Sequence, residues 1–368
     1  MLRDQLLRWL SRTVPDKGNN VSASIPIVLA TDVGLERTEN QDRVAAMRVD
    51  SRSGKRNGFS VVALADGMGG MVDGTSCAVQ ALANFFNHLA TEVSSTAEGL
   101  LEDAANAANI GVYQQFRGKG GATLSAVLFT DDRKVLLVNV GDSRIYAMSD
   151  ADPAVVSRLT VDDSLEEFVG GHGRELLQFI GMGEGLKPHV KNVDKDVKRV
   201  LITSDGVHFV SHETLVDVFS KAPDAYRAAE RLAALARWCG APDNASLAIV
   251  NIPEVAQCFE GRQDSGVELW DAFGSIKIIC ERESERQSAY SPLRQRQIEK
   301  QNISQEQRAL PEIVSTPKKL RKPRKEKEKG EKEKMLSQAA AGPQLTIDID
   351  AGSTDSNSTA SENNDDKS

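Results

Sequence analysis

Residues 59–70 read FSVVALADGMGG, an apolar run that ends abruptly in an acidic, glycine-rich turn. The β-branched and other apolar residues at 59–65 predict a buried strand. Asp66 stands at the end of that strand, and the glycines after it allow the backbone to approach a ligand closely. The stretch therefore predicts a strand that delivers a carboxylate to one end of a sheet.

Other segments repeat this strand pattern, and helical patterns lie between them. Further strands are predicted at 25–31, 122–130, 134–140, 144–148, 199–204 and 245–252. Helices are predicted around Val79–Leu89 and at 97–116, 212–220 and 223–239. Many hairpin-connected strands with helices gathered in two places favour a layered α+β fold over alternating βαβ units.

Composition excludes several classes of protein. The chain has 368 residues, of which 40% are hydrophobic, and its net charge is −8. No run approaches the ~20 apolar residues of a membrane-spanning helix. The four cysteines lie far apart without a CxxC pair, so we expect neither a zinc ribbon nor a disulfide framework, and a reducing cytoplasm fits best. The acidic globule argues against nonspecific nucleic-acid binding by that domain, and no specific nucleic-acid partner is expected.

The chain divides into four parts by composition. Residues 1–21 form an N-terminal arm, expected to be a helix packed on the domain rather than a secretory signal or membrane anchor. Residues 22–253 form the globular domain. Residues 254–285 contain an apolar island at 266–280, read either as a strand or helix docked on the domain or as a partner-binding segment.

The tail, 286–368, has the composition of disorder. Its segment 318–334 carries a net charge of +6, and 348–368 carries −5. Opposite charge blocks of this kind are usually solvated linker, and the alternative is a docking site for a partner. PQLTIDID, at 343–350, alternates like a strand and can also add to a sheet edge.

Five aspartates stand beside apolar runs or turns, and they carry the functional argument. They are Asp42, Asp66, Asp142, Asp205 and Asp243. Each alone reads as a turn residue. Together at one end of a sheet sandwich they would form a dense anionic site, which repels itself unless cations fill it. Oxygen ligands without clustered Cys or His select hard ions such as Mg²⁺ or Mn²⁺.

Six short motifs in order resemble the metal-dependent protein phosphatases of type 2C, most closely their bacterial branch. They are RTENQD (37–42), ADGMGG (65–70), GGAT (120–123), GDSR (141–144), SDGV (204–207) and DNAS (243–246). The resemblance implies a four-layer αββα sandwich, in which two antiparallel sheets are flanked by helices. It also implies a mobile flap at about 160–190 that tunes substrate choice.

The resemblance assigns roles to particular residues. Asp66 would bridge two metal ions, with the Gly67 carbonyl as a further ligand, and Asp205 and Asp243 would bind the second ion. Asp42 would hold metal-bound waters, and Asp142 with Asp205 would hold a third, weaker ion. Three more roles are implied for residues around the ligands: Arg37 would receive the substrate phosphate, Asn244 would orient its neighbours, and Gln41 replaces a residue that usually acts through water.

The implied activity is hydrolysis of phosphoserine and phosphothreonine in proteins by a hydroxide between two Mg²⁺ or Mn²⁺ ions. The implied partners are phosphoproteins, substrates of a partner kinase. Two alternatives stay open: a catalytically weak relative that binds phosphoproteins, and a phosphatase for a small phosphate ester. The five histidines show no metal-ligand spacing, so surface or supporting roles are favoured for them; for His208, which lies closest to the motifs, substrate contact is the alternative.

Overall fold

The computed structural model describes residues 2–21, 25–50, 58–68, 70–92, 94, 96–151, 154–170, 175–258 and 266–279. All of them belong to one compact unit, Met1–Gln301. The tail with its charge blocks and the 343–350 segment lie outside the described residues. No described helix is both long and apolar enough to cross a lipid bilayer.

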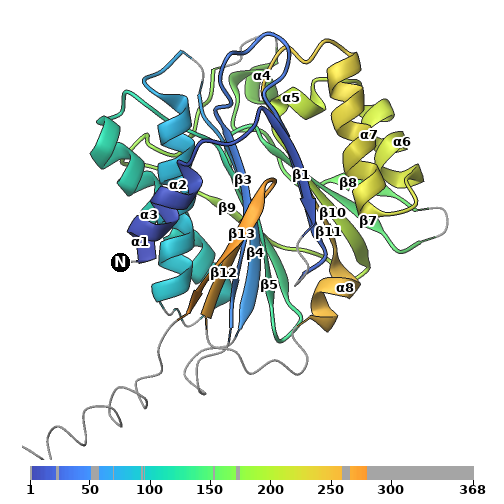
Figure 1. Ribbon diagram of the computed structural model, residues 1–368, viewed down its shortest axis with the longest axis horizontal. Coiled ribbons are helices and arrows are strands. Elements are labelled where there is room, and N and C mark those ends of the chain that lie inside the picture. The colour runs from blue at the N-terminus through green and yellow to red at the C-terminus, as the bar shows by residue number, and fades with distance from the viewer. Residues whose placement is uncertain are drawn as a thin grey trace, which may run out of the picture. The chain divides into compact units, whose positions relative to one another are not determined.

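Two antiparallel sheets lie at the centre of this unit (Figure 1). One has the strand order β1-β2-β11-β10-β7-β8 and the other β13-β12-β3-β4-β5-β6-β9. The strands of the first sheet are β1 (Lys17–Val21), β2 (Ile27–Asp32), β7 (Arg144–Ser149), β8 (Val156–Arg158), β10 (Val197–Thr203) and β11 (Ala245–Asn251). Those of the second are β3 (Asp42–Val49), β4 (Phe59–Asp66), β5 (Leu124–Thr130), β6 (Val135–Val140), β9 (His189–Asn192), β12 (Gly266–Asp271) and β13 (Gly274–Ile279).

Helices cover the outer faces of both sheets (Figure 1). The described helices are α1 (Leu2–Leu10), α2 (Gly74–Thr91), α3 (Ala97–Phe116), α4 (Leu165–Val169), α5 (Asp205–His208), α6 (His212–Lys221), α7 (Ala225–Trp238) and α8 (Ile252–Gln257). Of these, α4 has no buried residue, and α8 places Val255 in the cluster between the sheets. The first three pack on the β3–β4–β5 face, whereas α5, α6 and α7 pack on the β2–β11–β10 face.

Three hydrophobic clusters separate the four layers, and strand periodicity explains them. Along β4, Val61 and Ala63 join the cluster under α1–α3, whereas Val62 and Leu64 join the cluster between the sheets. A third cluster lies under α5–α7. Alternate side chains of a strand point to opposite faces, so strands apolar on both faces fill two clusters at once. The predicted αββα sandwich is confirmed.

The N-terminal arm and the β12–β13 hairpin contact each other at one edge. Arg12 Nη1 lies 2.6 Å from Asp271 Oδ2, and Asn20 Nδ2 donates to the Asp271 carbonyl at 2.7 Å. The hairpin pairs with β3 through β12, from Val267 opposite Val49 to Asp271 opposite Ala45. The described part of the apolar island, 266–279, is thus the edge of the sheet that carries β3.

Candidate active site

The expected metal ligands gather at one end of the two sheets. Asp42 begins β3 and Asp66 ends β4, and the two residues are direct partners in the antiparallel ladder. Asp205 follows β10 and begins α5, and Asp243 stands two residues before β11, which pairs with β10. Because the ends of these paired strands meet at the same edge, four carboxylates from distant parts of the chain come together.

Asp42 is the most deeply buried of these aspartates, at 2% exposure. Its Oδ2 accepts a hydrogen bond from Ser204 Oγ at 2.8 Å. Its Oδ1 is buried without a hydrogen-bond partner among the described residues. Burial raises the pKa of Asp42 to about 7, and the charges of Asp205 and Asp243 act in the same direction. A buried carboxylate oxygen without a partner can accept a hydrogen bond or bind a cation.

The neighbouring carboxylates also resist ionisation. Burial raises the pKa of Asp66 well above its usual value, and the charges of Asp42 and Asp205 add to the effect. Burial, followed by the charge of Asp205, raises the pKa of Asp142 to about 7. Carboxylates that raise one another's pKa are stabilised in their charged form by a cation between them. The cluster therefore has the electrostatic character of a divalent-cation site.

The oxygen atoms that could act as metal ligands here fit a hard cation. Carboxylate and carbonyl oxygens are the ligands of Mg²⁺ and Mn²⁺. Gly67 is required beside Asp66, because a Cβ at this position would lie 2.2 Å from the Gly74 carbonyl oxygen. Within the described ranges, no three Asp, Glu, His or Cys side chains form a ready-made ligand group. The described carboxylates are thus close enough to raise one another's pKa, but they do not form a preformed set of ligands around one metal position.

Arg37 forms an ion pair with Asp243 inside this group. Arg37 Nη2 lies 2.6 Å from Asp243 Oδ2, and the side chains are 41% and 31% exposed. Asp243 Oδ1 accepts the Asn244 backbone N–H at 2.8 Å. Both carboxylate oxygens of Asp243 therefore have partners, and its bond to Asn244 is local.

Asn244 joins the two loops that form the site. Its Oδ1 accepts the Gln41 backbone N–H at 2.8 Å. Its Nδ2 donates to the carbonyls of Val33 and Glu39 at 2.8 and 2.9 Å. Asn244 thus binds both ends of the loop between β2 and β3, which carries Arg37 and leads into Asp42. The Gln41 backbone carbonyl in turn accepts the Gly67 N–H at 3.2 Å.

Several polar residues that support the site were not singled out from the sequence. Asn40 Nδ2 donates to Thr31 Oγ1 at 2.8 Å, and Thr31 Oγ1 lies 2.7 Å from Ser246 Oγ. Ser204 Oγ, which binds Asp42, also accepts the Ser246 N–H at 2.9 Å. Asn40, Ser204 and Ser246 lie within the quoted motifs. Their positions close to the aspartates in the sequence are the feature from which a supporting role could be predicted.

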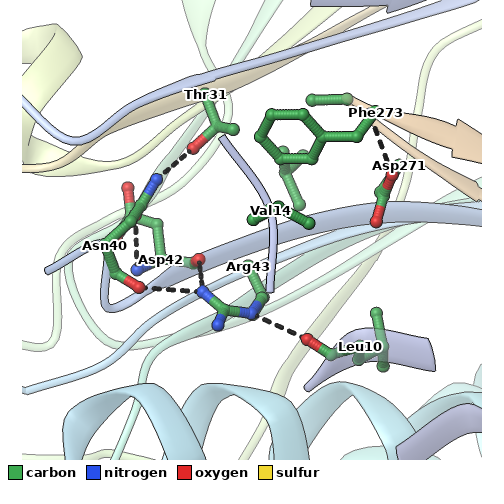
Figure 2. A pocket seen from close by; sticks show the side chains of 10 residues that line it. Leu10, Val14, Thr31, Asn40, Asp42, Arg43, Asp271 and Phe273 are labelled. Carbon is green, nitrogen blue, oxygen red and sulfur yellow. Dashed lines mark hydrogen bonds between the residues drawn. The ribbon is translucent and has the colours of Figure 1, made fainter. Parts of the chain in front are cut away.

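Arg43 supports the same loop from the opposite face of β3 (Figure 2). Its Nη1 donates to the carbonyls of Asn40 and Asp42 at 2.8 and 2.7 Å, and its Nε donates to the Leu10 carbonyl at 3.0 Å. A cavity of about 20 Å³ lies beside it, and Phe273 of the β12–β13 turn contributes to its lining. Arg43 thus connects the loop of the site to the N-terminal arm.

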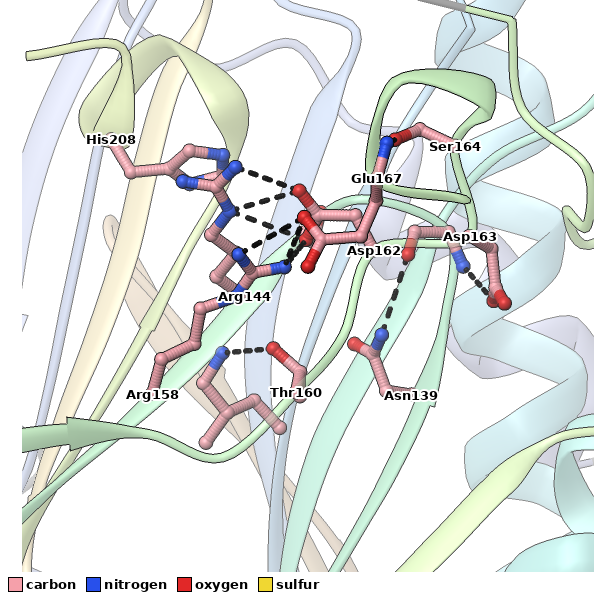
Figure 3. Close-up of polar contacts among 12 residues, drawn as sticks. Asn139, Arg144, Arg158, Thr160, Asp162, Asp163, Ser164, Glu167 and His208 are labelled. Carbon is pink, nitrogen blue, oxygen red and sulfur yellow. Dashed lines mark hydrogen bonds and ion pairs between the residues drawn. The ribbon is translucent and has the colours of Figure 1, made fainter. Parts of the chain in front are cut away.

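The segment expected to form a flap, about 160–190, begins in a network of ion pairs next to the GDSR motif (Figure 3). Arg144 Nη2 lies 2.7 Å from Asp162 Oδ2, and Arg158 pairs with the other oxygen of Asp162. Asp163 Oδ2 accepts the Gly141 N–H at 3.0 Å, and its Oδ1 lies 2.8 Å from His189 Nε2. These contacts join the base of the flap to the turn that carries Asp142.

His208 does not reach the site as a substrate contact. Its side chain is 9% exposed, and its Nδ1 lies 2.9 Å from Thr203 Oγ1. Burial, with the nearby charges of Arg144 and Arg158, lowers its pKa well below the usual value. The structure favours the supporting role of His208 over substrate contact, because α5 turns the ring back onto the end of β10.

Comparisons with known proteins point to one family. A family model described as "Protein phosphatase 2C" matches residues 36–240. The serine/threonine protein phosphatase PstP of Mycobacterium tuberculosis is 28% identical over 241 residues, which are 60% of this chain and 44% of PstP. This chain thus spans less than half the length of PstP. Protein phosphatase PhpP of Streptococcus pneumoniae is 27% identical over 248 residues, 62% of this chain and 98% of PhpP.

Solved structures agree with these sequence matches. The crystal structure of the PstP catalytic domain in complex with two manganese ions has a TM-score of 0.51 and 28% identity, and covers 61% of this chain and 96% of that one. The phosphatase MsPP from Mycobacterium smegmatis, in complex with cacodylate, has a TM-score of 0.50 and 27% identity, and covers 62% and 99%.

Proposed function

Since the chain belongs to the protein phosphatase 2C family, we propose that it hydrolyses phosphoserine and phosphothreonine in proteins with the help of Mg²⁺ or Mn²⁺. The observation that supports this most is the group of carboxylates with raised pKa values around Asp42 and Asp66, at one end of the sandwich. An arginine lies beside them, so the same end of the molecule offers sites for cations and for a phosphate.

In this proposal, two ions are held by Asp66, the Gly67 carbonyl, Asp205 and Asp243, and a third by Asp142 with Asp205. When bound, Mg²⁺ or Mn²⁺ supplies positive charge and lowers the pKa of a water for attack on phosphorus. Asp42 orients water through Oδ1, because its Oδ2 is already bonded to Ser204. Asn244 and Gln41 position the loop between β2 and β3.

Arg37 receives the phosphate in this mechanism. Asp243 has one hydrogen-bond partner on each carboxylate oxygen, Arg37 Nη2 on Oδ2 and the Asn244 N–H on Oδ1, so each oxygen keeps a lone pair that could ligate a cation. The Arg37 donors that Asp243 does not occupy would match phosphoryl oxygens and offset charge that develops on them. Arg37 is 41% exposed and stands at the mouth of the site, where a substrate can reach it.

The decisive experiment is hydrolysis of a phosphothreonine peptide by the full chain with Mn²⁺, with EDTA, and with Asp205→Asn. We expect Mn²⁺-dependent phosphate release that EDTA abolishes and that Asp205→Asn lowers by a factor of at least about 100. The matched control is Asp217→Asn, which removes an exposed carboxylate paired only with Lys221. Absence of Mn²⁺-dependent release by the wild type would contradict the enzyme proposal and favour a phosphoprotein-binding relative.

A small phosphate ester as natural substrate is the second alternative. It predicts that the specificity constant, kcat/KM, for small esters equals or exceeds that for phosphopeptides, which the same assay measures. We further propose a cytoplasmic protein that acts on the substrates of a partner kinase. In that proposal the domain spans 22–253 with a flap at about 160–190, and the charged tail after 286 docks a partner or remains a solvated linker.

A further inference from the structure

Exposed apolar side chains gather around the candidate active site. Eight large apolar residues of the described chain are more than half exposed. Five of the eight lie on segments that reach the site, namely Leu35, Val161, Phe168, Val169 and Trp238. Single exposed apolar residues need no explanation, but a concentration beside a polar site indicates a surface that binds something.

Trp238 is the most exposed of them, at 88%. It ends α7, and the chain then runs through 239–242 to Asp243. The loop after β2 lies directly against this connection, because the Leu35 N–H donates to the Ala241 carbonyl at 2.9 Å. A Cβ on Gly34 would lie 2.5 Å from the Asp243 carbonyl oxygen. Leu35 and Trp238 therefore belong to two loops in contact.

The same two loops hold the ion pair of the site. Arg37, two residues after Leu35, lies 2.6 Å from Asp243, five residues after Trp238. Five residues of fully extended chain span at most about 18 Å. An extended peptide rises about 3.3 Å per residue. A substrate whose phosphate lies on Arg37 therefore has side chains within about five residues that can reach Trp238.

The flap carries the second aromatic side chain. Phe168, on α4, is 82% exposed. Ser164 caps this helix, and the flap base is joined to the turn of Asp142 through the Asp163 N–H, which donates to the Gly141 carbonyl at 3.0 Å. Phe168 and Trp238 thus stand on different segments that both lead into the carboxylate group. Large aromatic side chains bury much apolar area on binding and dominate recognition surfaces.

We propose that Leu35, Phe168 and Trp238 form an apolar rim that binds an aliphatic or aromatic side chain within about five residues of the phosphorylated serine or threonine. This inference rests on the proposed function and names its substrate class, phosphoproteins with an apolar residue beside the phosphosite. Leu35 and Trp238 stand on the two loops that hold the Arg37–Asp243 ion pair, and Phe168 stands on the segment joined to the turn of Asp142. An extended phosphopeptide with its phosphate on Arg37 is the occupant whose length fits these contacts.

Two phosphothreonine peptides test this proposal. They are identical except for Leu or Gln three residues from the phosphothreonine, and p-nitrophenyl phosphate serves as a substrate without flanking residues. For the full chain with Mn²⁺ we expect kcat/KM to favour the Leu peptide about tenfold, mainly through KM. In Trp238→Ala the preference falls to about twofold or less, and kcat/KM for the Leu peptide falls far more than that for p-nitrophenyl phosphate.

Tyr226→Ala is the matched control, because Tyr226 is 39% exposed in the first turn of the same helix, away from the Asp243 loop. It should retain the preference for Leu. Leu35→Gln is the second rim variant and should also reduce the preference. Because Trp238 is almost fully exposed, its truncation should leave the melting temperature unchanged, which calorimetry checks.

Equal kcat/KM for the two peptides in the wild type, or a preference retained in Trp238→Ala, would overturn the apolar rim. Mn²⁺-dependent hydrolysis of both peptides would then still support the proposed function. If no peptide is hydrolysed, the proposed function fails, and the rim is tested separately by fluorescence anisotropy with the labelled peptides. Tighter binding of the Leu peptide that Trp238→Ala abolishes would support the rim, and equal binding would contradict it.

Discussion

The Asn244 side chain holds the loop between β2 and β3 in place, and this loop carries Arg37 and leads into Asp42. It holds Gln41, Val33 and Glu39 with three hydrogen bonds and is 4% exposed. Asn244→Ala leaves three backbone groups of the loop without this partner, each costing about 1–3 kcal/mol if it stays buried. We expect kcat/KM to fall at least about tenfold and Mn²⁺ affinity, measured by titration calorimetry, to weaken.

Asn192→Ala is the control for that variant, because the Asn192 side chain donates to Glu98 Oε1 at 3.2 Å in an exposed position, away from the site loops. It should leave both quantities within about twofold of the wild type. Unchanged Mn²⁺ affinity in Asn244→Ala would show that the loop between β2 and β3 keeps its place without the asparagine.

His208 makes the folded protein sensitive to acid. Its pKa is lowered by burial, so the folded protein keeps the ring neutral where the unfolded chain, with a pKa of about 6.5, takes up a proton. The contribution of His208 to the free energy of unfolding therefore falls as pH drops below about 6.5, by roughly 1 kcal/mol per pH unit at first, opposite in sign to the contribution of the site carboxylates. We expect the stability of His208→Gln relative to the wild type to increase between about pH 7.5 and 5.5.

Urea unfolding at several pH values measures this difference. His212→Gln serves as the control because His212 is exposed at the start of α6. Parallel pH profiles for the wild type and His208→Gln would mean that the buried ring takes up its proton in the folded state.

At the scale of elements, the β12–β13 hairpin closes the sheet that bears Asp42. Leu269 and Trp270 are fully buried, and β12 pairs with β3 along its length. A chain ending at about residue 262 exposes that strand edge and loses a buried tryptophan, which alone costs about 3–5 kcal/mol. We expect this truncation to unfold at a much lower urea concentration, or not to fold, whereas a chain ending at 284 should match the full chain.

Equal urea midpoints for the two truncations would contradict the structural role of the hairpin. A loss of activity without a loss of stability in the shorter chain would instead make the hairpin a support for the site loop, through Asp271, Phe273 and Arg43.

The apolar strands were predictable from the sequence, and the polar ones were not. The strand at 59–65 and the helix at 97–116 lie within a residue of β4 and α3. By contrast, β3 was missed because Arg43 and Arg48 interrupt its apolar pattern. Only the structure shows that Arg43 bonds backbone carbonyls and that Arg48 pairs with Asp50 at 2.8 Å. The strand β1, KGNNV, was missed because its apolar content is too low for any pattern.

The site shows the same division. The strand-end position of Asp66, Asp205 and Asp243 is visible in the sequence, because each stands next to an apolar run. These aspartates come together because strands about 200 residues apart in the sequence pair with each other. The periodicity of apolar residues predicts strands but not which strands pair. The support from Asn40, Ser204 and Arg43 depends on which carbonyl or hydroxyl lies within 3 Å, and only the folded structure determines that.

For the whole molecule, the raised pKa values predict how metal and pH act together. Asp42 and Asp142 have pKa values of about 7 in the fold, against about 3.9 when unfolded. The metal-free folded protein binds more protons than the unfolded chain between these values, so its stability falls as pH rises from about 4 to about 7. Cations remove this penalty by pairing with the ionised carboxylates.

We therefore expect the rise in melting temperature produced by Mn²⁺ to increase between about pH 5.5 and 7.5 and to vanish with EDTA. Asp205→Asn should reduce the rise and weaken its pH dependence, because it removes both a ligand and a repelling charge. A rise that is independent of pH would show that Mn²⁺ binds away from the carboxylate group.

Strand pairing also sets the order in which the molecule becomes functional during its synthesis. The residues of β2 and β3 leave the ribosome early, but β2 pairs with β11, where Asp32 lies opposite Ala245, and β3 pairs with β12, where Val49 lies opposite Val267. Such long-range pairings form late because they close long loops. The nascent chain therefore lacks Asp243 until residue 243 and the β12 partner of β3 until residue 271 have been translated, so the carboxylate group is complete only in a nearly finished domain.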